Sequence, residues 1–379
     1  MSKHLRILSI SQYGADLASG SAFSGALDRQ RDYARLVAAF DVIVPGRKHT
    51  LAFHEDSLFV HTVPARTPIH FFIAAYRQAV RMHTQAPYDV LMVDTPHLSG
   101  LLGIVLRARL GVPLVVHSMA DMIDNPWYGR ERRLNMLKMA LMSLVCYGAD
   151  VVRVSTCAEV ERLQAAGMAP EKIAFVPFYI DHTEFSRTLF ACTQTVSEPH
   201  TLLYVGRLSP QKDVVTLIRA MQYVVRDVPE ARLRIVGGGS ESAIVQALAA
   251  ACGVTQAIDF CGPIPREDIA CEFRRAGIFV LSSLYEGTCM VLHEAALAGL
   301  PIVSTDHAGA KDFVVDGKNG IVVHVRDHRG LARAIVALLK DPSMSQRMGQ
   351  GSLERVQHCT KEAALVHMRS LMDRFVRQV

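Results

Sequence analysis

The chain has 379 residues, of which 50% are hydrophobic and 20% are charged, a composition typical of a globular protein rather than a disordered one. Single cores seldom exceed about 250–300 residues, so this length predicts two domains. The net charge of +5 does not indicate a nucleic-acid-binding protein, although it suits an anionic ligand or an acidic membrane surface.

The eight cysteines are scattered, and none forms a Cys-x-x-Cys pair or a Cys/His cluster with zinc-ligand spacing. This pattern predicts free, buried thiols in a reducing compartment. The first expected strand, Leu5–Ile10, is not preceded by the long apolar region of a signal peptide. No stretch reaches the ~18–20 apolar residues that span a bilayer. We therefore expect a cytoplasmic protein.

In the first half, short apolar runs alternate with helix-period segments such as 26–39 and 68–82. The runs are rich in β-branched residues and read as buried parallel strands. The expected strands are Leu5–Ile10, Asp41–Val44, Val90–Val93, Leu114–His117, Val151–Val154 and Ile173–Val176.

A polar segment, 191–200, contains no strand pattern and is interpreted as a linker. A second alternating series follows it, at Thr201–Val205, Arg232–Val236, Ala257–Cys261, Ile278–Leu281, Pro301–Ser304 and Gly320–Val323. The fold class expected is therefore α/β, with two Rossmann-like doubly wound parallel-sheet domains facing each other across a cleft. The expected domains are residues 1–190 and 198–360, and ligands should bind beyond the carboxyl ends of the strands.

Two loops of the second half carry charged residues at such strand ends. Arg207 and Lys212 lie within five residues of each other beside a helix start, where an anion would gain both charges and helix N-terminal amides. Taken alone, the pair is equally well explained as surface cations in a turn. Glu286 lies in the other loop, and Glu294 lies in an apolar helix, where a carboxylate is costly unless it is paired or accepts hydrogen bonds. Sugar or ribose hydroxyls could donate hydrogen bonds to the Glu294 carboxylate, and a structural ion pair could equally compensate its charge.

Together these loops resemble the donor side of the large retaining glycosyltransferase family of the two-Rossmann GT-B type, family 4, also called glycosyl transferases group 1. The family is typified by bacterial α-mannosyl- and α-glucosyltransferases. The resemblance covers the whole second half in the right order. The matching segments are Val205-Gly206-Arg207-Leu208 with Lys212, Val236–Gly239, Phe260–Gly262, Glu286-Gly287 with Glu294-Ala295, and Ala298–Pro301.

The resemblance implies a role for each matching residue. Arg207 and Lys212 would hold the donor diphosphate and neutralise the charge that grows on it, and Glu286 would bind the donor sugar. Glu294 would accept hydrogen bonds from the ribose. The other donor-binding positions implied are Gly206, Gly262, Pro263 and Ile264 beside the nucleobase, and Gly287, Thr288, Cys289, Met290 and Val291 at the start of a helix.

The first half matches the family more weakly. His117 stands at a strand end where the family has a histidine that reaches the donor sugar, although a lone histidine there is as often a hydrogen-bonded structural residue. The glycine-containing loop after Ile10 is longer than in relatives, and only Gly20 and Ser21 are matched to it. The last helix, 361–379, is expected to cross back to the first domain, as in the family.

Other function classes are weighed against this reading. A dehydrogenase is rejected because Gly237-Gly238-Gly239 lacks the third glycine of the dinucleotide motif, so it is interpreted as a tight strand-to-helix connection. No Asp-x-Asp triplet occurs, and Arg207 and Lys212 can do the work of a metal, so neither metal nor other cofactor is expected. A non-catalytic nucleotide-sugar-binding or assembly protein and a sugar phosphorylase stay open as alternatives.

The partners expected are a UDP- or GDP-linked sugar and a carbohydrate or lipid-linked acceptor, with no nucleic acid. The family-level expectation is polysaccharide, glycolipid or lipid-linked oligosaccharide synthesis. Two segments, 69–81 and 127–142, mix apolar residues with arginines and lysine as a basic amphipathic face does. Contact with the inner membrane face is therefore one hypothesis, and for the first segment packing of the helix on the N-terminal sheet is the other.

Overall fold

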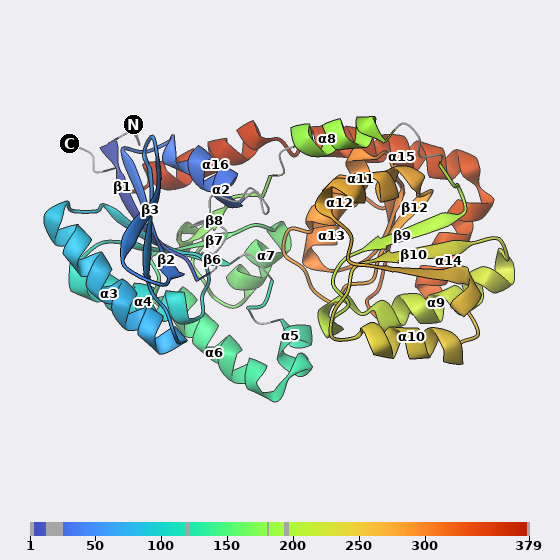
Figure 1. Ribbon diagram of the computed structural model, residues 1–379, viewed down its shortest axis with the longest axis horizontal. Helices are drawn as coiled ribbons and strands as arrows, with labels where there is room; N and C mark the ends of the chain where they lie inside the picture. Colours follow the sequence, from blue (N-terminus) through green and yellow to red (C-terminus); the bar gives the residue numbers. More distant parts are fainter. Residues whose placement is uncertain are drawn as a thin grey trace. The chain divides into compact units, whose positions relative to one another are not determined.

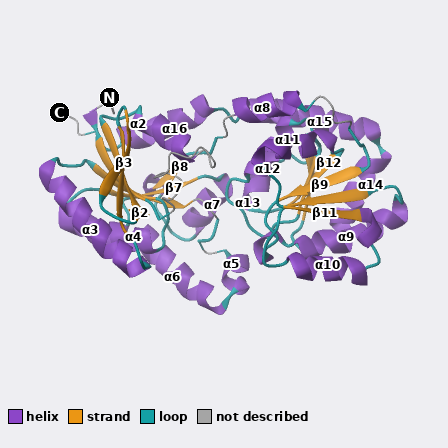
Figure 2. Ribbon diagram, in the orientation of Figure 1, coloured by secondary structure: helices purple, strands orange, loops and turns teal. Residues whose placement is uncertain are grey.

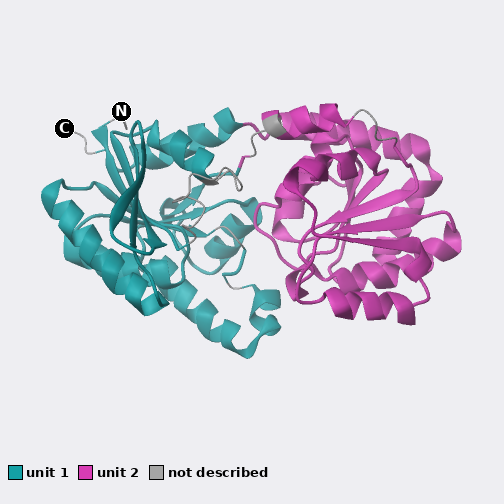
Figure 3. Cartoon of the chain, in the orientation of Figure 1, with its two compact units in different colours: residues 1–178, 361–379 teal, residues 179–360 magenta. Residues whose placement is uncertain are grey.

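The structure is a computed structural model that describes residues 4–12, 26–118, 121–123, 125–179, 182–192 and 197–376. The chain divides into two compact units, Met1–Phe178 with Lys361–Val379, and Tyr179–Thr360 (Figure 3). Each unit is built on a parallel or mostly parallel sheet covered by helices, which confirms the expected fold class of two α/β domains.

Unit 1 contains an eight-stranded sheet in the order β3-β4-β2-β1-β5-β6-β7-β8. All neighbouring strands are parallel except the pair β3–β4. The central strands are apolar on both faces because helices cover both sides of the sheet. The strands are β1 (Arg6–Ile10), β2 (Ala39–Gly46), β3 (Thr50–Glu55), β4 (Leu58–Pro64), β5 (Val90–Val93), β6 (Leu114–Ser118), β7 (Val151–Val154) and β8 (Ile173–Phe175).

Helices α3, α4 and α6 run along one side of this sheet, and α2 and α16 lie on the other (Figure 1). Thr67 caps the start of α3 by accepting a hydrogen bond from the His70 amide, and Pro68 occupies the first turn. The helices of unit 1 are α2 (Ala26–Ala34), α3 (Pro68–Gln85), α4 (Leu98–Leu110), α5 (Pro126–Glu131), α6 (Arg133–Gly148), α7 (Cys157–Ala165) and α16 (Lys361–Asp373).

The hairpin β3–β4 is an element that the sequence analysis did not predict. Its edge strand β3 is largely exposed, so its side chains show no buried apolar run. The turn at Asp56 adopts a positive φ of 50°, which Asp tolerates better than most residues. β4 then pairs in parallel with β2 and extends the sheet beyond the expected strands.

Unit 2 contains a six-stranded parallel sheet in the order β11-β10-β9-β12-β13-β14. The order changes direction at β9, which lies between β10 and β12. The strands are β9 (Thr201–Val205), β10 (Arg232–Val236), β11 (Ile258–Gly262), β12 (Ile278–Leu281), β13 (Ile302–Thr305) and β14 (Gly320–Val323), each within one residue of its predicted bounds.

In unit 2, α9, α10 and α14 lie on one side of the sheet and α8, α11 and α12 on the other (Figure 2). The apolar stripe of α9 is fully buried, which is why this helix packs firmly on the strands. The helices are α8 (His182–Ala191), α9 (Val214–Asp227), α10 (Ser242–Ala251), α11 (Arg266–Arg275), α12 (Met290–Leu297), α13 (Ala308–Phe313), α14 (His328–Lys340) and α15 (Pro342–Gln357), with a short 3-10 turn at Pro210–Lys212.

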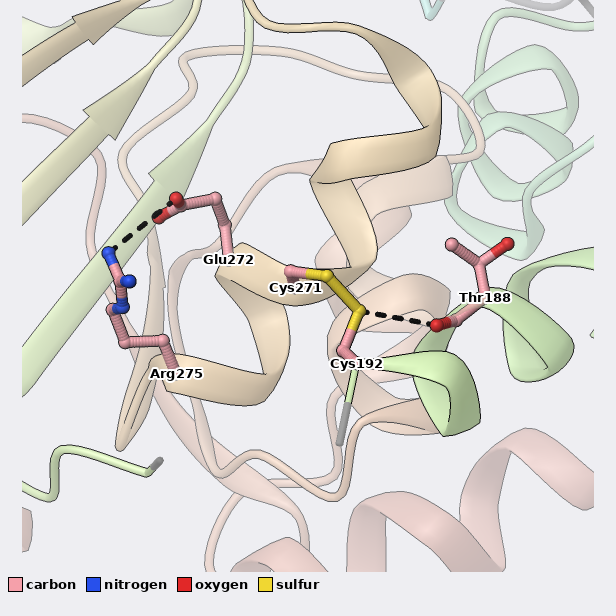
Figure 4. Close-up of a disulfide and its surroundings, with 5 residues drawn as sticks. All are labelled: Thr188, Cys192, Cys271, Glu272 and Arg275. Atoms are coloured by element: carbon pink, nitrogen blue, oxygen red, sulfur yellow. Dashed lines mark hydrogen bonds and ion pairs between the residues drawn. A yellow bond between two sulfur atoms is a disulfide. The ribbon is translucent and has the colours of Figure 1, made fainter. Parts of the chain in front are cut away.

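A disulfide joins Cys192, just after α8, to Cys271 on α11 (Figure 4). The prediction that all cysteines are free thiols is therefore wrong, because the fold brings together two cysteines separated by 79 residues. Phe185 of α8 also packs edge-on against Phe273 of α11. These contacts place α8 in unit 2, so the first unit ends at residue 178 rather than at the expected 190.

The last described helix, α16, belongs to unit 1 although it follows all of unit 2 in the chain. Lys361 Nζ lies 2.6 Å from the buried Asp32 carboxylate of α2. His367 packs edge-on against Phe175 of β8. Unit 1 is therefore assembled from both ends of the chain.

Candidate active site

The loops after β9 and β12 lie side by side at the carboxyl edge of the unit 2 sheet. These two strands are neighbours at the point where the strand order reverses, which is where ligands bind in open α/β sheets. The Leu284 amide donates to the Gln211 carbonyl at 2.8 Å, and Gln211 Nε2 donates to the Tyr285 carbonyl at 2.9 Å. The Ser282 hydroxyl donates to the Lys212 carbonyl at 3.0 Å. The sequence-predicted donor loops are thus joined to each other.

Lys212 and Glu286 form an ion pair within this junction. Lys212 Nζ lies 2.5 Å from Glu286 Oε1, and the two side chains are 11% and 12% exposed. The Ser283 hydroxyl donates to the same oxygen at 3.1 Å. Burial alone would lower the pKa of Lys212, but the Glu286 carboxylate outweighs it and the pKa is raised. Lys212 is therefore a permanent cation at neutral pH.

Arg207 supplies a second cation with a different setting. Its side chain is exposed, and it forms no ion pair with any residue that the structure describes. Its carbonyl accepts a hydrogen bond of 3.0 Å from the Tyr204 hydroxyl, and burial raises the pKa of Tyr204 well above its ordinary value. The loop is thus fixed while the guanidinium stays available to a ligand.

The helix after the β12 loop begins at Met290, and Glu294 is its fifth residue. The Cys289 side chain makes no capping hydrogen bond, so the first amides of α12 have no side-chain partner. Thr288, Met290 and Val291 are half-buried there. Burial, followed by the charge of Glu286, raises the pKa of the Cys289 thiol to about 12, which makes it unreactive.

Glu294 is half-buried, and its carboxylate forms no hydrogen bond or ion pair within the described part of the chain. Burial raises its pKa to about 7, and the more distant Arg266 lowers it only partly. The structural ion pair that the sequence left open is therefore not present. The carboxylate is available to hydroxyl donors of a ligand.

Two glycines allow these loops to approach each other closely. A side chain at Gly237, where φ is 129°, would place its Cβ 2.0 Å from the Gly206 carbonyl oxygen. A Cβ at Gly309 would lie 2.0 Å from the Gly287 carbonyl oxygen. No side chain fits at such distances, so Gly237 and Gly309 hold the two candidate ligand loops in place.

The segment expected beside the nucleobase also lies at this edge. The Gly262 carbonyl, where β11 ends, accepts a hydrogen bond of 2.8 Å from the Gly237 amide. Pro263 lies near Gly238, and Ile264 packs partly against the core. The triple glycine forms the tight strand-to-helix connection that the sequence predicted, and α10 begins at Ser242.

Sequence reasoning missed His307, which is buried beneath the ion pair. Burial lowers its pKa to about 4, although the Glu286 charge acts in the opposite direction. Its Nδ1 accepts a hydrogen bond of 3.2 Å from the Ala310 amide and so caps α13 as a neutral ring. The Thr305 hydroxyl donates to the Ser283 carbonyl at 2.6 Å. A histidine directly before an Ala-Gly-Ala helix start was the available signal.

In unit 1, His117 is the last but one residue of β6 and is 8% exposed. Burial and the charge of Arg153 hold the pKa of His117 well below its ordinary value, so the ring is neutral. Its Nε2 has no hydrogen-bond partner within the described residues. The alternative role, a structural histidine held by hydrogen bonds, is therefore not supported at that atom. Gly20 and Ser21 lie outside the described residues.

Two further features are absent from the residues that the structure describes. No group of three or more His, Cys, Asp or Glu side chains in that part of the chain is arranged to hold a metal ion. No helix there is both long and apolar enough to cross a membrane.

Two family models match the chain. Residues 187–355 match the model described as "Glycosyl transferases group 1", and residues 26–178 match "Glycosyl transferase 4-like domain". The first match includes every donor-side residue singled out above, and the two matches follow the two units closely.

Curated relatives carry related names. A D-inositol 3-phosphate glycosyltransferase from Streptomyces scabiei is 28% identical over 322 residues, which cover 80% of this chain and 71% of that protein. A GDP-mannose-dependent alpha-(1-6)-phosphatidylinositol monomannoside mannosyltransferase from Mycolicibacterium smegmatis is 29% identical over 281 residues, covering 69% and 73%.

Solved structures share the fold. Sucrose-phosphate synthase from Thermosynechococcus elongatus superposes with a TM-score of 0.78 at 19% identity, covering 97% of this chain and 98% of that one. Anabaena HepE in complex with UDP-glucose superposes with a TM-score of 0.73 at 18% identity, covering 98% and 99%.

Proposed function

Because the chain belongs to the group 1 glycosyltransferases of the GT-B fold, we propose that it transfers a hexose from a nucleoside-diphosphate sugar to an acceptor hydroxyl with retention of configuration. The observation that carries the proposal is the buried Lys212–Glu286 ion pair beside the exposed Arg207. One carboxylate and two cations at a strand-order reversal suit a ligand with sugar hydroxyls at one end and a diphosphate at the other.

Arg207 and Lys212 would stabilise the leaving diphosphate. As the bond between the anomeric carbon and the phosphate oxygen breaks, the nucleoside diphosphate keeps the electron pair and gains negative charge. The first amides of α12, which have no side-chain cap, would add hydrogen bonds to the same charge. With these cations present, the reaction needs no metal ion and no further cofactor.

The transfer would take place on one face of the sugar. The acceptor oxygen bonds to the anomeric carbon on the side that the diphosphate leaves, and its proton passes to an oxygen of the departing phosphate. Glu286 would orient the sugar through its hydroxyls rather than attack it, because one of its oxygens is already held by Lys212 and Ser283. His117, neutral and with a free Nε2, would hydrogen-bond the sugar.

Glu294 would bind the ribose hydroxyls, since its carboxylate has no partner among the residues that the structure describes. The names of two comparison proteins, a GDP-mannose-dependent mannosyltransferase and a protein crystallised with UDP-glucose, support a UDP- or GDP-linked donor. Gly262–Ile264 would contact the nucleobase through the main chain, and Gly206 and Gly287–Val291 would line the phosphate and sugar positions.

The acceptor would be a carbohydrate or a lipid-linked sugar used in polysaccharide, glycolipid or lipid-linked oligosaccharide synthesis. A peripheral membrane contact fits the surface of α6, where Leu134, Met136 and Leu137 are 68%, 70% and 71% exposed. Exposed cations adjoin them at Arg130, Arg132, Arg133 and Lys138. Such a basic, apolar face suits an anionic lipid surface of the cytoplasmic compartment.

The decisive experiment is a thermal-shift panel with UDP, GDP, ADP and their common sugars. We expect one nucleotide to raise the melting temperature of the wild type, because a ligand at a hundredfold excess over its Kd adds about 2.7 kcal/mol of stability. Arg207→Ala should lose this shift. Arg333→Ala is the matched control, since it removes an arginine that is 74% exposed on α14.

Product analysis completes the test. Release of the matching nucleoside diphosphate, with the sugar joined to an acceptor in its original anomeric configuration, supports the proposal. Sugar 1-phosphate formed only when phosphate is added would identify a phosphorylase instead. No shift with any nucleotide would favour a non-catalytic protein on the same fold.

A further inference from the structure

A cavity of about 300 Å³ lies within unit 1, lined by residues of that unit. It is bounded by residues at the carboxyl ends of β1, β5, β6 and β7, which meet at one edge of the parallel sheet, and by α2. The side chains that matter for its chemistry are Ser11, Tyr33, Asp94, His117 and Arg153. Its size is at the lower end of the range for small-molecule sites.

Arg153 is a buried cation in the wall of this cavity. It is 2% exposed, and no carboxylate of the described residues lies within ion-pair distance of it. Nη2 donates to the Tyr33 hydroxyl at 2.8 Å, and the guanidinium carbon lies 5.1 Å from the centre of the Tyr33 ring. Nη1 is buried and has no partner in the described part of the chain.

An uncompensated buried guanidinium is costly, because a charge taken out of water must be paired or solvated by hydrogen bonds. Tyr33 is neutral and occupies only one of the five N–H donors. The fold holds the guanidinium in place through stacking and this one bond, and leaves Nη1 unused. An anion in the cavity would supply the missing charge and the missing acceptors.

The other polar groups of the cavity do not neutralise Arg153. His117 is its register partner on the neighbouring strand, and burial together with the Arg153 charge keeps the pKa of this histidine low and the ring neutral. The Asp94 carboxylate accepts hydrogen bonds from Ser11 at 2.7 Å and Ser99 at 3.0 Å. The lining includes a second arginine, Arg29, so it holds two arginines against one aspartate.

We infer that this cavity is a subsite for a phosphoryl group carried by the acceptor, and that Arg153 is the residue that binds it. The inference rests on the proposed function, since it assigns the acceptor class of that reaction. A guanidinium binds phosphoryl oxygens through paired hydrogen bonds, and low-dielectric walls strengthen that attraction. The donor diphosphate has its own cations, Arg207 and Lys212, in unit 2.

The test measures the melting temperature of the full chain in inorganic phosphate, against potassium chloride at equal ionic strength. Phosphate should stabilise the wild type by a few degrees. Arg153→Met should lose this effect and, in phosphate-free buffer, should melt no lower than the wild type because an unpaired buried charge has been removed. Arg109→Met, which removes an exposed arginine of α4, is the matched control and should respond to phosphate like the wild type.

Saturating nucleotide shows which of the two sites, the Arg153 cavity or the donor diphosphate site, binds the added phosphate. If phosphate and nucleotide stabilise the wild type additively, and phosphate still stabilises Arg207→Ala, the phosphate site is separate from the donor site and the inference is supported. If nucleotide abolishes the phosphate effect, or Arg153→Met retains it, phosphate binds in the donor diphosphate site and the inference fails. Absence of any phosphate effect in the wild type overturns it also.

Arg153→Lys serves if the methionine variant does not fold. It keeps the charge but loses the planar fork, so phosphate should still stabilise it, with at least tenfold weaker apparent affinity. Equal affinity in Arg153→Lys and the wild type would contradict the assigned role. The nucleotide panel can fail without the phosphate test failing. Phosphate binding through Arg153 without any nucleotide binding would contradict the transferase proposal but would still support an anion site at Arg153.

Discussion

Lys212 and Glu286 form a buried ion pair, with Nζ 2.5 Å from Oε1. The same two loops are joined by a hydrogen bond between Gln211 and Tyr285, which lie 74 residues apart in the sequence. Removing one member of the ion pair leaves the other as an unpaired buried charge, which costs about 3–5 kcal/mol. We expect Lys212→Met and Glu286→Gln each to lower the free energy of unfolding of unit 2 by an amount of this order, measured by denaturant titration.

The double variant Lys212→Met/Glu286→Gln separates stability from activity. It should regain much of the lost stability, because no unpaired charge remains, yet its turnover should stay about 10²–10³-fold below the wild type. Product release measured at saturating donor checks this. A double variant that recovers both stability and turnover would show that the pair is only structural.

Glu294 predicts a pH dependence of nucleotide binding. Burial raises its pKa from 4.5 to about 7, and the ionised form is the better acceptor for ribose hydroxyls. Affinity for the nucleotide should therefore fall as the pH drops from 8 to 6, as measured by calorimetric titration. Glu294→Gln should bind more weakly at pH 8 and show a flat profile; a slope equal to that of the wild type would count against this role.

The same group predicts how stability of the unliganded protein changes with pH. A carboxyl whose pKa is higher when folded contributes stability below its unfolded pKa of about 4.5, and this contribution is lost as the pH rises through 7. Glu294→Gln removes the buried negative charge, so at pH 8 it should melt higher than the wild type. The difference should vanish near pH 5, and a constant difference across this range would refute the cause.

The disulfide predicts sensitivity to reductants. Cys192 and Cys271 close a loop with a sequence separation of 79, and reduction should cost about 4.5 kcal/mol by the chain-entropy relation. Once reduced, the Cys192 thiol can donate to the Thr188 carbonyl oxygen 3.2 Å away, which would recover part of that loss. Thermal melts with and without reductant measure the cost.

A serine variant provides the control for reduction. Cys192→Ser/Cys271→Ser should melt like the reduced wild type and be indifferent to reductant, whereas Cys252→Ser, which alters a free cysteine of unit 2, should keep the full response. Thiol titration of the unfolded chain should find six thiols before reduction and eight after it. Eight in both cases would show that the bond does not form.

The exposed face of α6 predicts binding to acidic vesicles. Leu134→Glu/Leu137→Glu should abolish flotation with anionic liposomes, while Ile244→Glu, which alters an exposed apolar residue of unit 2, should leave it unchanged. High salt should weaken binding because the adjoining cations contribute to it. If the wild-type chain does not float with anionic vesicles, the membrane hypothesis is wrong.

All strands of the two sheets except β3 and β4 could be predicted from sequence, because they are short apolar runs of the kind seen in Ile278–Leu281. The hairpin β3–β4 could not, because its outer strand is exposed and lacks that pattern. The disulfide was missed for another reason: sequence spacing does not reveal which helices pack together, and residues 182–190 had been assigned to the first domain.

The donor loops were found because family motifs and strand ends pointed to the same residues. The motifs predicted Lys212 and Glu286 as site residues but not the ion pair between them. That pair depends on β9 and β12 being neighbours in the sheet. Arg153 gave no signal at all. An arginine inside a run such as Val151–Val154 reads as one polar position in a strand, and only the packing of Tyr33 against it reveals an unpaired charge.

The position of α16 has a consequence for biosynthesis. Its anchors, Lys361 on Asp32 and His367 on Phe175, can form only after the residues that follow unit 2 have left the ribosome. Unit 2 is contiguous in sequence and is complete before then, whereas the N-terminal unit emerges first and finishes last. A stop codon shortly after residue 360 would therefore spare the later-synthesised unit and leave the earlier one with an uncovered face, a lesion that chaperones or proteases would recognise.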